Sequence, residues 1–223
     1  MAIFATYITN LYGYRLRKSN SLEKKRIRIE YANRMLSKLN IEIKVINKDK
    51  IPEDGQYLLV SNHRTIIDPT IIEVALENKK LFGHWISKKE LYDSFFFGLF
   101  VRNAGTILLD REKSQMGGFF KEIKAVVKDG DSIYIFPEGT RNKSDEILGE
   151  FKDGSQLIAM RNKIDILPIY IRNRADNILA EAIKDSSIKR VIEVEFGELI
   201  SYKDREFSLE DAYKKRFSIE NSV

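Results

Sequence analysis

Residues 56–69, with the sequence QYLLVSNHRTIIDP, determine the fold class. They begin with a short, nearly continuous apolar run, which is typical of a strand buried on both faces of a sheet. A polar loop follows, and then Asp68-Pro69, a pair that favours the start of a helix because Asp caps it and Pro fits its first position. The stretch therefore predicts a buried strand, a loop and a helix in succession, which is the repeating unit of α/β domains.

Strand and helix patterns alternate on both sides of this stretch. Residues 41–47, IEIKVIN, alternate between apolar and polar positions and predict a strand. Further strands are predicted at residues 81–87, 106–109, 132–136, 164–171 and 190–196, and helices at residues 69–78, 95–103, 115–127 and 151–161. The fold class that follows is α/β, with a mixed, largely parallel sheet flanked by helices. Pro168 predicts an edge or bulged position for its strand, and the charged tail after Ser201 predicts a loosely packed helix.

The first 40 residues predict a pair of amphipathic helices. Ile3, Tyr7 and Leu11 lie on one line of the first helix, and the second is expected over residues 21–40. The first 14 residues carry no charged side chain, but a membrane-spanning helix needs about 20 apolar residues. An apolar, tyrosine-rich stripe followed by clustered Lys and Arg is typical of a helix in a membrane interface. The alternative is an ordinary helix pair that packs on the core and exposes a solvated basic face.

Positive charge is concentrated in the same region. The chain of 223 residues has a net charge of +5, yet the segment from Arg15 to Arg28 contains seven basic residues against one acid. The remainder therefore sums to −1, which argues against binding to nucleic acid and leaves an anionic lipid surface as the expected partner. With 43% hydrophobic and 32% charged residues, the chain predicts one globular domain at residues 41–223 behind an N-terminal segment at residues 1–40.

The absence of cysteine restricts the chemistry. No disulfide, thiolate nucleophile or thiolate zinc site is possible, and the two histidines, His63 and His84, are too few for a multi-histidine metal centre. We therefore expect no metal. A reducing, cytosol-facing location is compatible with this composition.

The loop after the buried strand carries the first candidate site. His63 and Asp68 lie five residues apart, about 140° around a regular helix, so they would not share a helix face. A loop that leads into a helix start allows His63 to fold back onto the Asp68 carboxylate. This contact would fix the tautomer of the imidazole and leave its other nitrogen as a general base. The alternative is that Asp68 only caps the helix and His63 bonds to the backbone.

Two further strand ends carry arginines suited to phosphate. Residues 132–141, SIYIFPEGTR, place Glu138, Gly139 and Arg141 directly after an apolar strand. Gly139 allows close approach of the backbone, Arg141 offers a planar fork for a phosphate, and Glu138 can hold hydroxyls or orient the arginine. Arg111 follows another apolar strand and is a second candidate. The alternative for the FPEGTR stretch is a surface turn with an ion pair, and the alternative for Arg111 is a pair with Asp110 or Glu112.

Taken together, these stretches resemble the four acyltransferase motifs of the PlsC family, the 1-acyl-glycerol-3-phosphate acyltransferases and their relatives. The matching elements are His63-x4-Asp68 preceded by Asn62, Gly105-x4-Asp110-Arg111, the FPEGTR stretch at residues 136–141, and the strand with Pro168. Their order and spacing agree with the family over about half of the chain, from residue 57 to residue 171. The stretch SKKEL at residues 87–91 is also similar to the lysine-containing segment that precedes the second motif of the family.

The resemblance implies an O-acyltransferase. His63 would be the general base, oriented by Asp68, that takes the proton from a glycerol hydroxyl, and the freed oxygen would attack the thioester of acyl-CoA or acyl carrier protein. The expected acceptor is a lysophosphatidic acid and the product is phosphatidic acid, with no cofactor besides the acyl donor. The residues expected to bind the phosphate and glycerol are Lys88 (or its neighbour Lys89), Arg111, Glu138, Gly139, Thr140 and Arg141.

Other acceptors and other classes of protein stay open. Glycerol-3-phosphate, another lysophospholipid or a lyso-aminolipid would use much the same motifs. Outside acyl transfer, the alternatives are a non-catalytic lipid-binding module and a soluble phosphohydrolase, although the latter would need metal-ligating carboxylates or a covalent nucleophile. Because the substrate lies in a bilayer, residues 1–40 are expected to anchor a peripheral, monotopic enzyme at the cytoplasmic face. The run FFFGLF at residues 95–100 is expected to line an acyl tunnel, to enter lipid, or to pack in the core.

Overall fold

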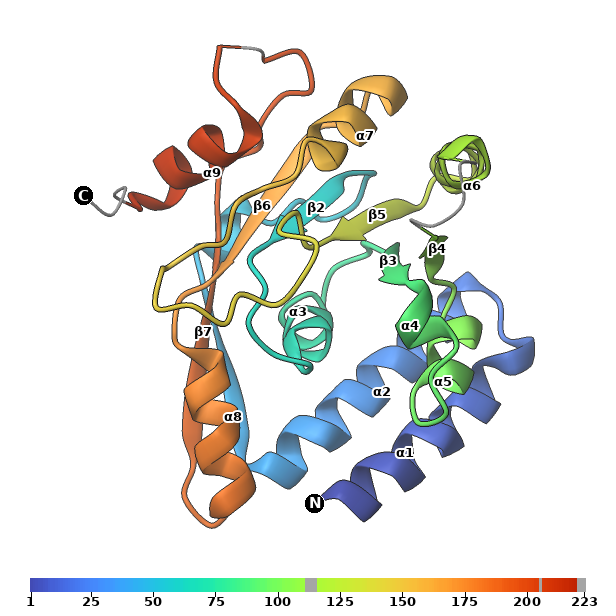
Figure 1. Cartoon of the computed structure of the whole chain (residues 1–223), viewed down its shortest axis with the longest axis vertical. Helices are drawn as coiled ribbons and strands as arrows, with labels where there is room; N and C mark the ends of the chain where they lie inside the picture. The colour runs from blue at the N-terminus through green and yellow to red at the C-terminus, as the bar shows by residue number, and fades with distance from the viewer. Residues whose placement is uncertain (111–115, 205, 220–223) are drawn as a thin grey trace.

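The computed structural model describes residues 1–110, 116–204 and 206–219, and within them seven strands form one sheet. The strands are β1 Ile41–Ile46, β2 Leu58–Ser61, β3 Gly83–Lys88, β4 Ile107–Leu109, β5 Ser132–Ile135, β6 Ile166–Ile171 and β7 Arg190–Phe196. Their spatial order is β1-β7-β6-β2-β5-β3-β4, and every neighbouring pair is parallel except β6 with β7. The prediction of a mixed, largely parallel sheet is therefore confirmed (Figure 1).

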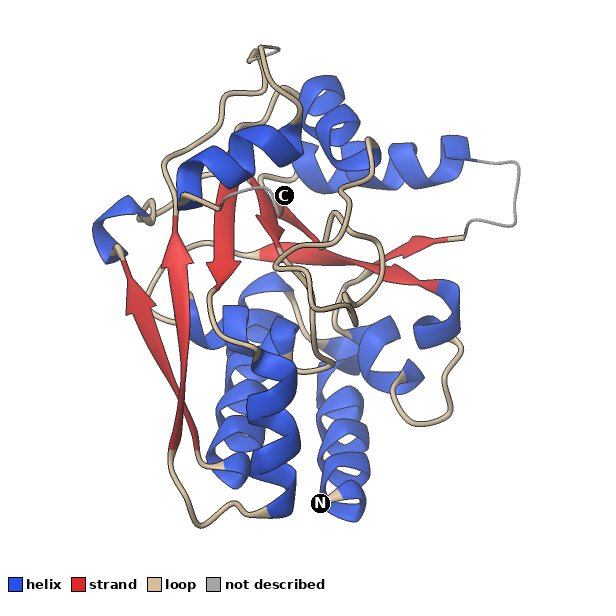
Figure 2. Cartoon of the chain, turned by 60° about the vertical axis from the view of Figure 1, so that its left-hand side comes forward, coloured by secondary structure: helices blue, strands red, loops and turns tan. Residues whose placement is uncertain are grey.

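Helices cover both faces of the sheet. They are α1 Ala2–Arg15, α2 Ser21–Leu39, α3 Asp68–Ala75, α4 Lys89–Tyr92, α5 Gly98–Asn103, α6 Met116–Lys128, α7 Gly154–Asn162, α8 Ala175–Lys184 and α9 Leu209–Phe217, with short 3-10 turns at Leu16–Lys18 and Lys48–Lys50. One face carries α2, α3 and α8 over a core shared with β1, β6 and β7, and the other carries α6, α7 and α9 over a second core. Figure 2 shows the strands between these groups of helices.

Strand β2 lies between β5 and β6 in the middle of the sheet. All four of its residues are buried, as expected for an apolar run with a layer of helices on each face. The polar loop that follows β2 therefore leaves the sheet at its centre. This is the position from which the candidate histidine loop projects.

Strand β6 lies between β2 and β7, so of the two positions expected for Pro168, an edge or a bulge, the edge is wrong. The antiparallel ladder with β7 begins only at Ile169, opposite Phe196. The Pro168 carbonyl accepts a hydrogen bond from Gly197 N at 3.0 Å, just beyond the end of β7. The pairing continues at Ile166 with Ile200, with one extra residue on the partner segment, and a bulge of this kind is where an interior strand tolerates a residue without an N–H.

Two helices form the N-terminal segment, as predicted, and both pack on the rest of the chain. A capping box begins α2, in which Asn20 Oδ1 accepts from Glu23 N and Glu23 accepts from Asn20 N. Leu36 and Leu39 of α2 join the same core as α3, while α1 packs against α2 and α5 around Tyr12. In the described part of the chain, every helix is too short or too polar to span a bilayer.

The C-terminal helix differs from the expectation of loose packing. Its buried residues, on one face of α9, are Leu209, Ala212, Tyr213 and Phe217. These residues belong to the second core, but the charged residues between them obscure the helical pattern in the sequence. Helices α4 and α8 are absent from the sequence prediction, and the helix expected at residues 95–103 begins only at Gly98.

Candidate active site

The loop between β2 and α3 brings His63 onto Asp68, as predicted. His63 Nδ1 lies 2.8 Å from Asp68 Oδ2, and the Asp68 side chain is completely buried. Because a carboxylate accepts hydrogen bonds, Nδ1 carries the proton and Nε2 is left as the nitrogen that can accept one. The His63 side chain is 17% exposed, so a substrate can reach the ring.

Asp68 does not cap α3. Its carboxylate turns back to the loop, where it accepts hydrogen bonds from Arg64 N at 2.6 Å, Thr65 N at 2.8 Å and Thr65 Oγ1 at 2.5 Å. Helix α3 has no side-chain cap, although Pro69 lies in its first turn as expected. The alternative of a simple capping role is therefore wrong. Together with His63, these donors supply four hydrogen bonds, which offset the cost of burying the carboxylate.

Glu138 links the histidine loop to the segment after β5. Its Oε1 accepts from His63 N at 2.7 Å, and its Oε2 accepts from Gly149 N at 2.9 Å. Burial raises the pKa of the Glu138 carboxyl, while the two backbone N–H groups act in the opposite direction. Both carboxylate oxygens thus hold backbone groups, so the structure gives Glu138 the task of joining two loops.

Arg64 is a residue of the site that sequence reasoning missed. Its buried guanidinium donates to three carbonyl oxygens of one loop, those of Ser144, Glu146 and Ile147. The same loop begins at Asn142, whose N–H donates to His63 O at 2.7 Å. These bonds fasten the loop to the histidine segment. The partners of Arg64 lie about 80 positions away, so spacing in the sequence contained no signal for them.

An aromatic ring lies against the face of His63. Phe136, the first residue after β5, stacks on the imidazole with ring centroids 4.0 Å apart and planes 10° from parallel. β2 and β5 are paired with Val60 opposite Ile135, which places the residues after each strand side by side. Phe136 belongs to the FPEGTR stretch, but its contact with His63 depends on a strand pairing that local sequence does not contain.

The rest of the FPEGTR stretch forms a turn at the same edge of the sheet, buried at Pro137 and Glu138 and exposed at its end. Gly139 has a φ of +66°, a left-handed conformation that favours glycine, and its N–H donates to Phe136 O at 3.0 Å. Thr140 and Arg141 follow and are exposed to solvent. The turn therefore presents a hydroxyl and a guanidinium close to the histidine loop.

The second motif is described in part. Lys88, half-buried, ends β3, the strand next to β5. Lys89 Nζ lies 3.3 Å from Asp110 Oδ2, so this lysine joins the end of β3 to the residue after β4. Arg111, predicted as a second phosphate ligand, lies outside the described residues.

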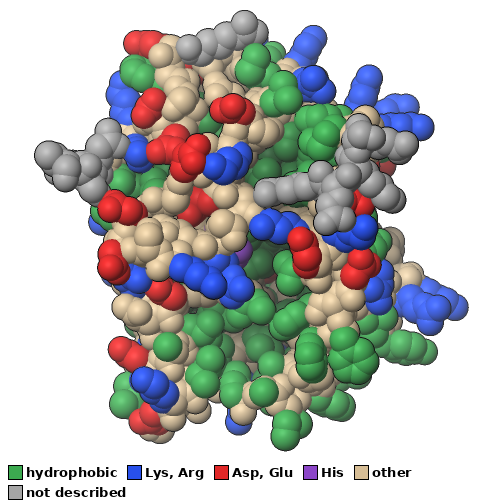
Figure 3. All heavy atoms as spheres, viewed as in Figure 1, with side chains coloured by type: hydrophobic (Ala, Val, Ile, Leu, Met, Phe, Trp, Pro, Cys, Tyr) green, Lys and Arg blue, Asp and Glu red, His purple; other side chains and the backbone are tan. Residues whose placement is uncertain are grey.

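The site opens on the face of the molecule shown in Figure 3. A histidine is visible in a central hollow, with Lys and Arg on both sides and a mainly hydrophobic area below. Such an arrangement suits a molecule with an anionic head and an apolar chain. Among the described residues, no group of three His, Asp or Glu side chains is arranged to hold a metal ion.

Comparison with known proteins agrees with this geometry. The sequence profile of the Acyltransferase family matches residues 42–172, more than half of the chain. The chain belongs to this family. Both members of the histidine–aspartate pair and the whole FPEGTR stretch lie inside the matched range.

Relatives that match the chain bear the name of the activity that the motifs predict. The chain is 35% identical to the 1-acyl-sn-glycerol-3-phosphate acyltransferase of Streptococcus pneumoniae over 114 residues, which cover 51% of this chain and 40% of that protein. It is also 35% identical to the protein of the same name from Helicobacter pylori over 117 residues, 51% of this chain and 48% of that protein. The match thus spans less than half the length of these relatives.

A solved structure has the same fold. The crystal structure of the 1-acyl-sn-glycerophosphate (LPA) acyltransferase, PlsC, from Thermotoga maritima aligns with a TM-score of 0.66 and 21% sequence identity. The alignment covers 98% of this chain and 94% of that chain, so the N-terminal helices are included. The predicted resemblance to the PlsC family and the predicted fold class are both confirmed.

Proposed function

We propose that this acyltransferase transfers a fatty acyl chain from an acyl thioester to the free hydroxyl of a lysophosphatidic acid, which gives phosphatidic acid. The observation that carries the proposal is the His63–Asp68 pair, in which a buried carboxylate holds Nδ1 at 2.8 Å and Nε2 is left to accept a proton. The substrate class follows the names of the relatives. The donor is an acyl-CoA or an acyl carrier protein, and no other cofactor is required.

In the proposed reaction, His63 acts first as general base and then as general acid. Nε2 takes the proton from the acceptor hydroxyl while the oxygen attacks the thioester carbonyl carbon and forms the new C–O bond. The Asp68 carboxylate stabilises the imidazolium that forms. The tetrahedral intermediate then collapses, the C–S bond breaks, and the imidazolium returns the proton to the departing sulfur. The thiol leaves without an acyl-enzyme intermediate.

The acceptor phosphate is assigned to the turn after β5 and to the end of β3. Arg141 and Thr140 are exposed in this turn, and Lys88 ends the strand next to β5. An arginine fork with a neighbouring hydroxyl and ammonium is well suited to a phosphate. Arg111 is assigned as a further phosphate ligand by its place in the second motif. Glu138 supports this site through the backbone groups that it holds.

The N-terminal helices are assigned as a peripheral anchor on the cytoplasmic face of a membrane. α1 exposes Ile3 at 88% and Tyr7 at 65% of their areas, and the turn before α5 exposes Phe95 at 89% and Phe96 at 53%. α1 packs against α5, so both apolar groups belong to one end of the molecule. Large apolar side chains gathered at one end of a protein are typical of an interaction surface.

Only part of the basic segment is available for anionic lipid. Arg28 is buried against Glu73, and Arg15 pairs with Glu30 at 2.8 Å. The members of the segment that are exposed are Arg17, Lys18 and Arg26. Their positive charge adds an electrostatic contribution to the proposed membrane docking.

An acylation assay of the purified protein tests the proposed reaction. Detergent-dispersed lysophosphatidate is supplied with acyl-CoA or acyl carrier protein, and glycerol-3-phosphate, another lysophospholipid and a lyso-aminolipid serve as alternative acceptors. We expect thiol release that depends on lysophosphatidate, and phosphatidic acid as product. His63→Ala is expected to lower kcat/KM by about 10²- to 10⁴-fold because the general base is lost. The matched control is His84→Gln, since His84 bonds to Gly105 O and Asp131 and not to Asp68.

The same assay separates the alternatives. A higher rate with another acceptor would identify that acceptor, rather than lysophosphatidate, as the substrate. Binding of lysophosphatidate without thiol release would favour the lipid-binding module, and release of inorganic phosphate would favour the phosphohydrolase. Full activity in His63→Ala would show that His63 is not the general base.

A further inference from the structure

The protein holds the His63 ring at two places, the Nδ1 atom and the face of the ring. The hydrogen bond to Asp68 fixes the position of Nδ1 but permits the imidazole to rotate about the line that joins the two atoms. Phe136 lies parallel to the ring, at a centroid distance of 4.0 Å and with 10° between the planes. Because the stack opposes that rotation, the two contacts together fix the direction in which Nε2 points.

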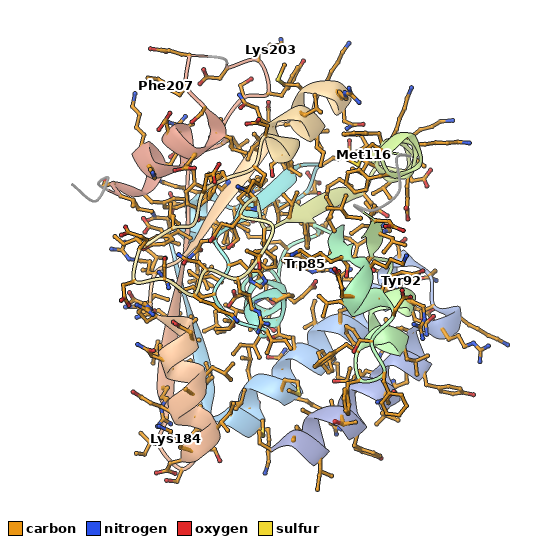
Figure 4. The ribbon with its side chains drawn as sticks, in the orientation of Figure 1. Trp85, Tyr92, Met116, Lys184, Lys203 and Phe207 are labelled. Atoms are coloured by element: carbon orange, nitrogen blue, oxygen red, sulfur yellow. The ribbon has the colours of Figure 1, made fainter. Side chains whose placement is uncertain are left out.

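A second aromatic ring supports Phe136. Trp85 stacks on Phe136 with ring centroids 4.9 Å apart and planes 22° from parallel. It is buried, and its indole Nε1 donates to Glu73 Oε1 at 2.9 Å, which fixes the orientation of the indole. Figure 4 shows Trp85 at the centre of the molecule, between β3 and α3.

Glu73 is fixed in turn by a buried ion pair. Arg28 Nε, from α2, donates to Glu73 Oε1 at 3.0 Å, and Arg28 Nη1 donates to Gly83 O at 2.7 Å. Both charged side chains are buried, and loss of one partner would leave an uncompensated charge in the interior. The carboxylate that receives the indole N–H is therefore held between two helices and cannot move independently of them.

The two supports of His63 end on the same helix. α3 begins with Asp68, which holds Nδ1, and five residues later it carries Glu73, which holds Trp85. A closed ring of contacts results, from Asp68 through His63, Phe136 and Trp85 to Glu73. We infer that Phe136 is a positioning residue for His63 and that Trp85, through its bond to Glu73, holds Phe136 in place.

The kinetic consequence rests on the proposed acyl transfer, whereas the position of the ring does not. Proton transfer requires Nε2 to lie within hydrogen-bond reach of the acceptor hydroxyl, and a misplacement of about 1 Å costs on the order of 10² in rate. The Phe136 side chain acts on the reaction through its contact with His63. Its loss is therefore expected to lower kcat and to leave KM close to its original value.

Three variants separate positioning from packing. Phe136→Leu removes the flat ring, Phe136→Tyr keeps it, and Phe196→Leu makes the same change at a fully buried residue of β7 in the same core. With lysophosphatidate and acyl-CoA, we expect Phe136→Leu to lower kcat about 10- to 100-fold and to change KM less than about 3-fold. Phe136→Tyr should restore kcat to within about 3-fold, and Phe196→Leu should lower the melting temperature but not kcat.

The NMR resonance of the His63 Hε1 proton reports the stack without any substrate. The chain has two histidines, so the spectrum of His84→Gln assigns both lines. The ring current of Phe136 shifts the His63 line upfield, and we expect this line to move downfield in Phe136→Leu and to keep its place in Phe196→Leu. Trp85→Phe keeps an aromatic ring but loses the N–H donor, so an intermediate shift and an intermediate kcat are expected.

The inference would be overturned if, in folded Phe136→Leu, the His63 line kept its wild-type position and kcat kept its wild-type value. If Phe136→Leu does not fold, Phe136→Met fills the same space with an unbranched apolar chain and is judged by the same two measurements. An upfield His63 line in a wild-type protein that transfers no acyl group would overturn the proposed function while supporting the positioning of His63 by Phe136.

Discussion

A buried carboxylate that accepts four hydrogen bonds determines both the shape of the loop around the site and the tautomer of the His63 ring. Asp68 receives bonds from the His63 ring, from the N–H groups of Arg64 and Thr65, and from the Thr65 hydroxyl. Every partner donates, so the residue at this position has to accept on all sides. An amide cannot do so, because its nitrogen would face groups that also donate.

Asp68→Asn is therefore expected to affect stability and activity together. Buried donors left without an acceptor would cost about 1–3 kcal/mol of unfolding free energy. The His63 ring would lose the acceptor for Nδ1–H, and the reversed tautomer would carry its proton on Nε2, so kcat/KM should fall about 10³-fold or more. Urea unfolding and acylation rates measure the two effects. Thr70→Val is the control, because the Thr70 hydroxyl donates to Ile67 O, just before α3, and its loss should cost stability without lowering kcat/KM.

The residues of the site differ in how far the sequence could predict them. His63 and Asp68 lie five positions apart in one loop, so their contact could be proposed from the residues, with a capping role for Asp68 as the alternative, and the family resemblance favoured the contact. Glu138 and Phe136 meet the same histidine from about 75 positions away, and only the pairing of β2 with β5 brings them there. The role of Glu138 was predicted incompletely for this reason, since its backbone partners are set by the fold rather than by its neighbours in the sequence.

At the scale of elements, a small polar cluster ties α1 to α2. Arg15 donates to both oxygens of Glu30 at 2.9 and 2.8 Å, and Tyr12 OH donates to Oε1 at 2.6 Å. These hydrogen bonds, that of Arg15 first, lower the pKa of Glu30 to about 2. A carboxyl whose pKa is lower in the folded state than in the unfolded state stabilises the fold above its unfolded pKa, about 4.3. This stabilisation is lost as the pH falls towards 2.

Glu30→Gln is accordingly expected to lower the free energy of unfolding near neutral pH but not in strong acid. The loss should be no more than about 1 kcal/mol, because the two side chains of the pair remain 34% and 40% exposed and water screens them. The difference from the wild type should shrink as the pH is lowered from about 4.3 to about 2. Urea unfolding across this range measures it. A difference that stays constant over the whole range would contradict the assigned ionisation of Glu30.

The elements of the sheet were easier to predict than their order. A strand buried on both faces, such as β2, is apolar throughout, so a short window of sequence is enough to find it. The position of a strand in the sheet depends on distant segments: β1 and β2 follow one another in the chain, yet β7 and β6 lie between them. Helix α9 lies between these cases, because its buried residues have helical spacing but are separated by charged ones.

At the scale of the whole molecule, the apolar N-terminal end and the opposite end differ in character. Ile3 of α1 and Phe95, in the turn before α5, are almost fully exposed, and α1 packs against α5. Figure 4 places Lys203 and Phe207 at the far end of the molecule from α1. The hollow with the histidine lies between these ends, and the surface between it and the N-terminal helices is mainly hydrophobic in Figure 3. An acyl chain that leaves a bilayer at the α1 end would thus cross apolar surface on its way to the site.

This orientation predicts that apolar contacts at the α1 end, and not exposed apolar residues in general, hold the protein on a membrane. The double variant Ile3→Ser/Phe95→Ser should bind phosphatidylcholine vesicles containing phosphatidylserine at least about 10-fold more weakly, since each side chain buried in lipid contributes about 1.5–3 kcal/mol. Phe207→Ser, which removes a 37% exposed aromatic side chain at the far end, should bind as the wild type does. Sedimentation with vesicles measures both. Equal binding by the double variant and the wild type would show that another surface faces the lipid.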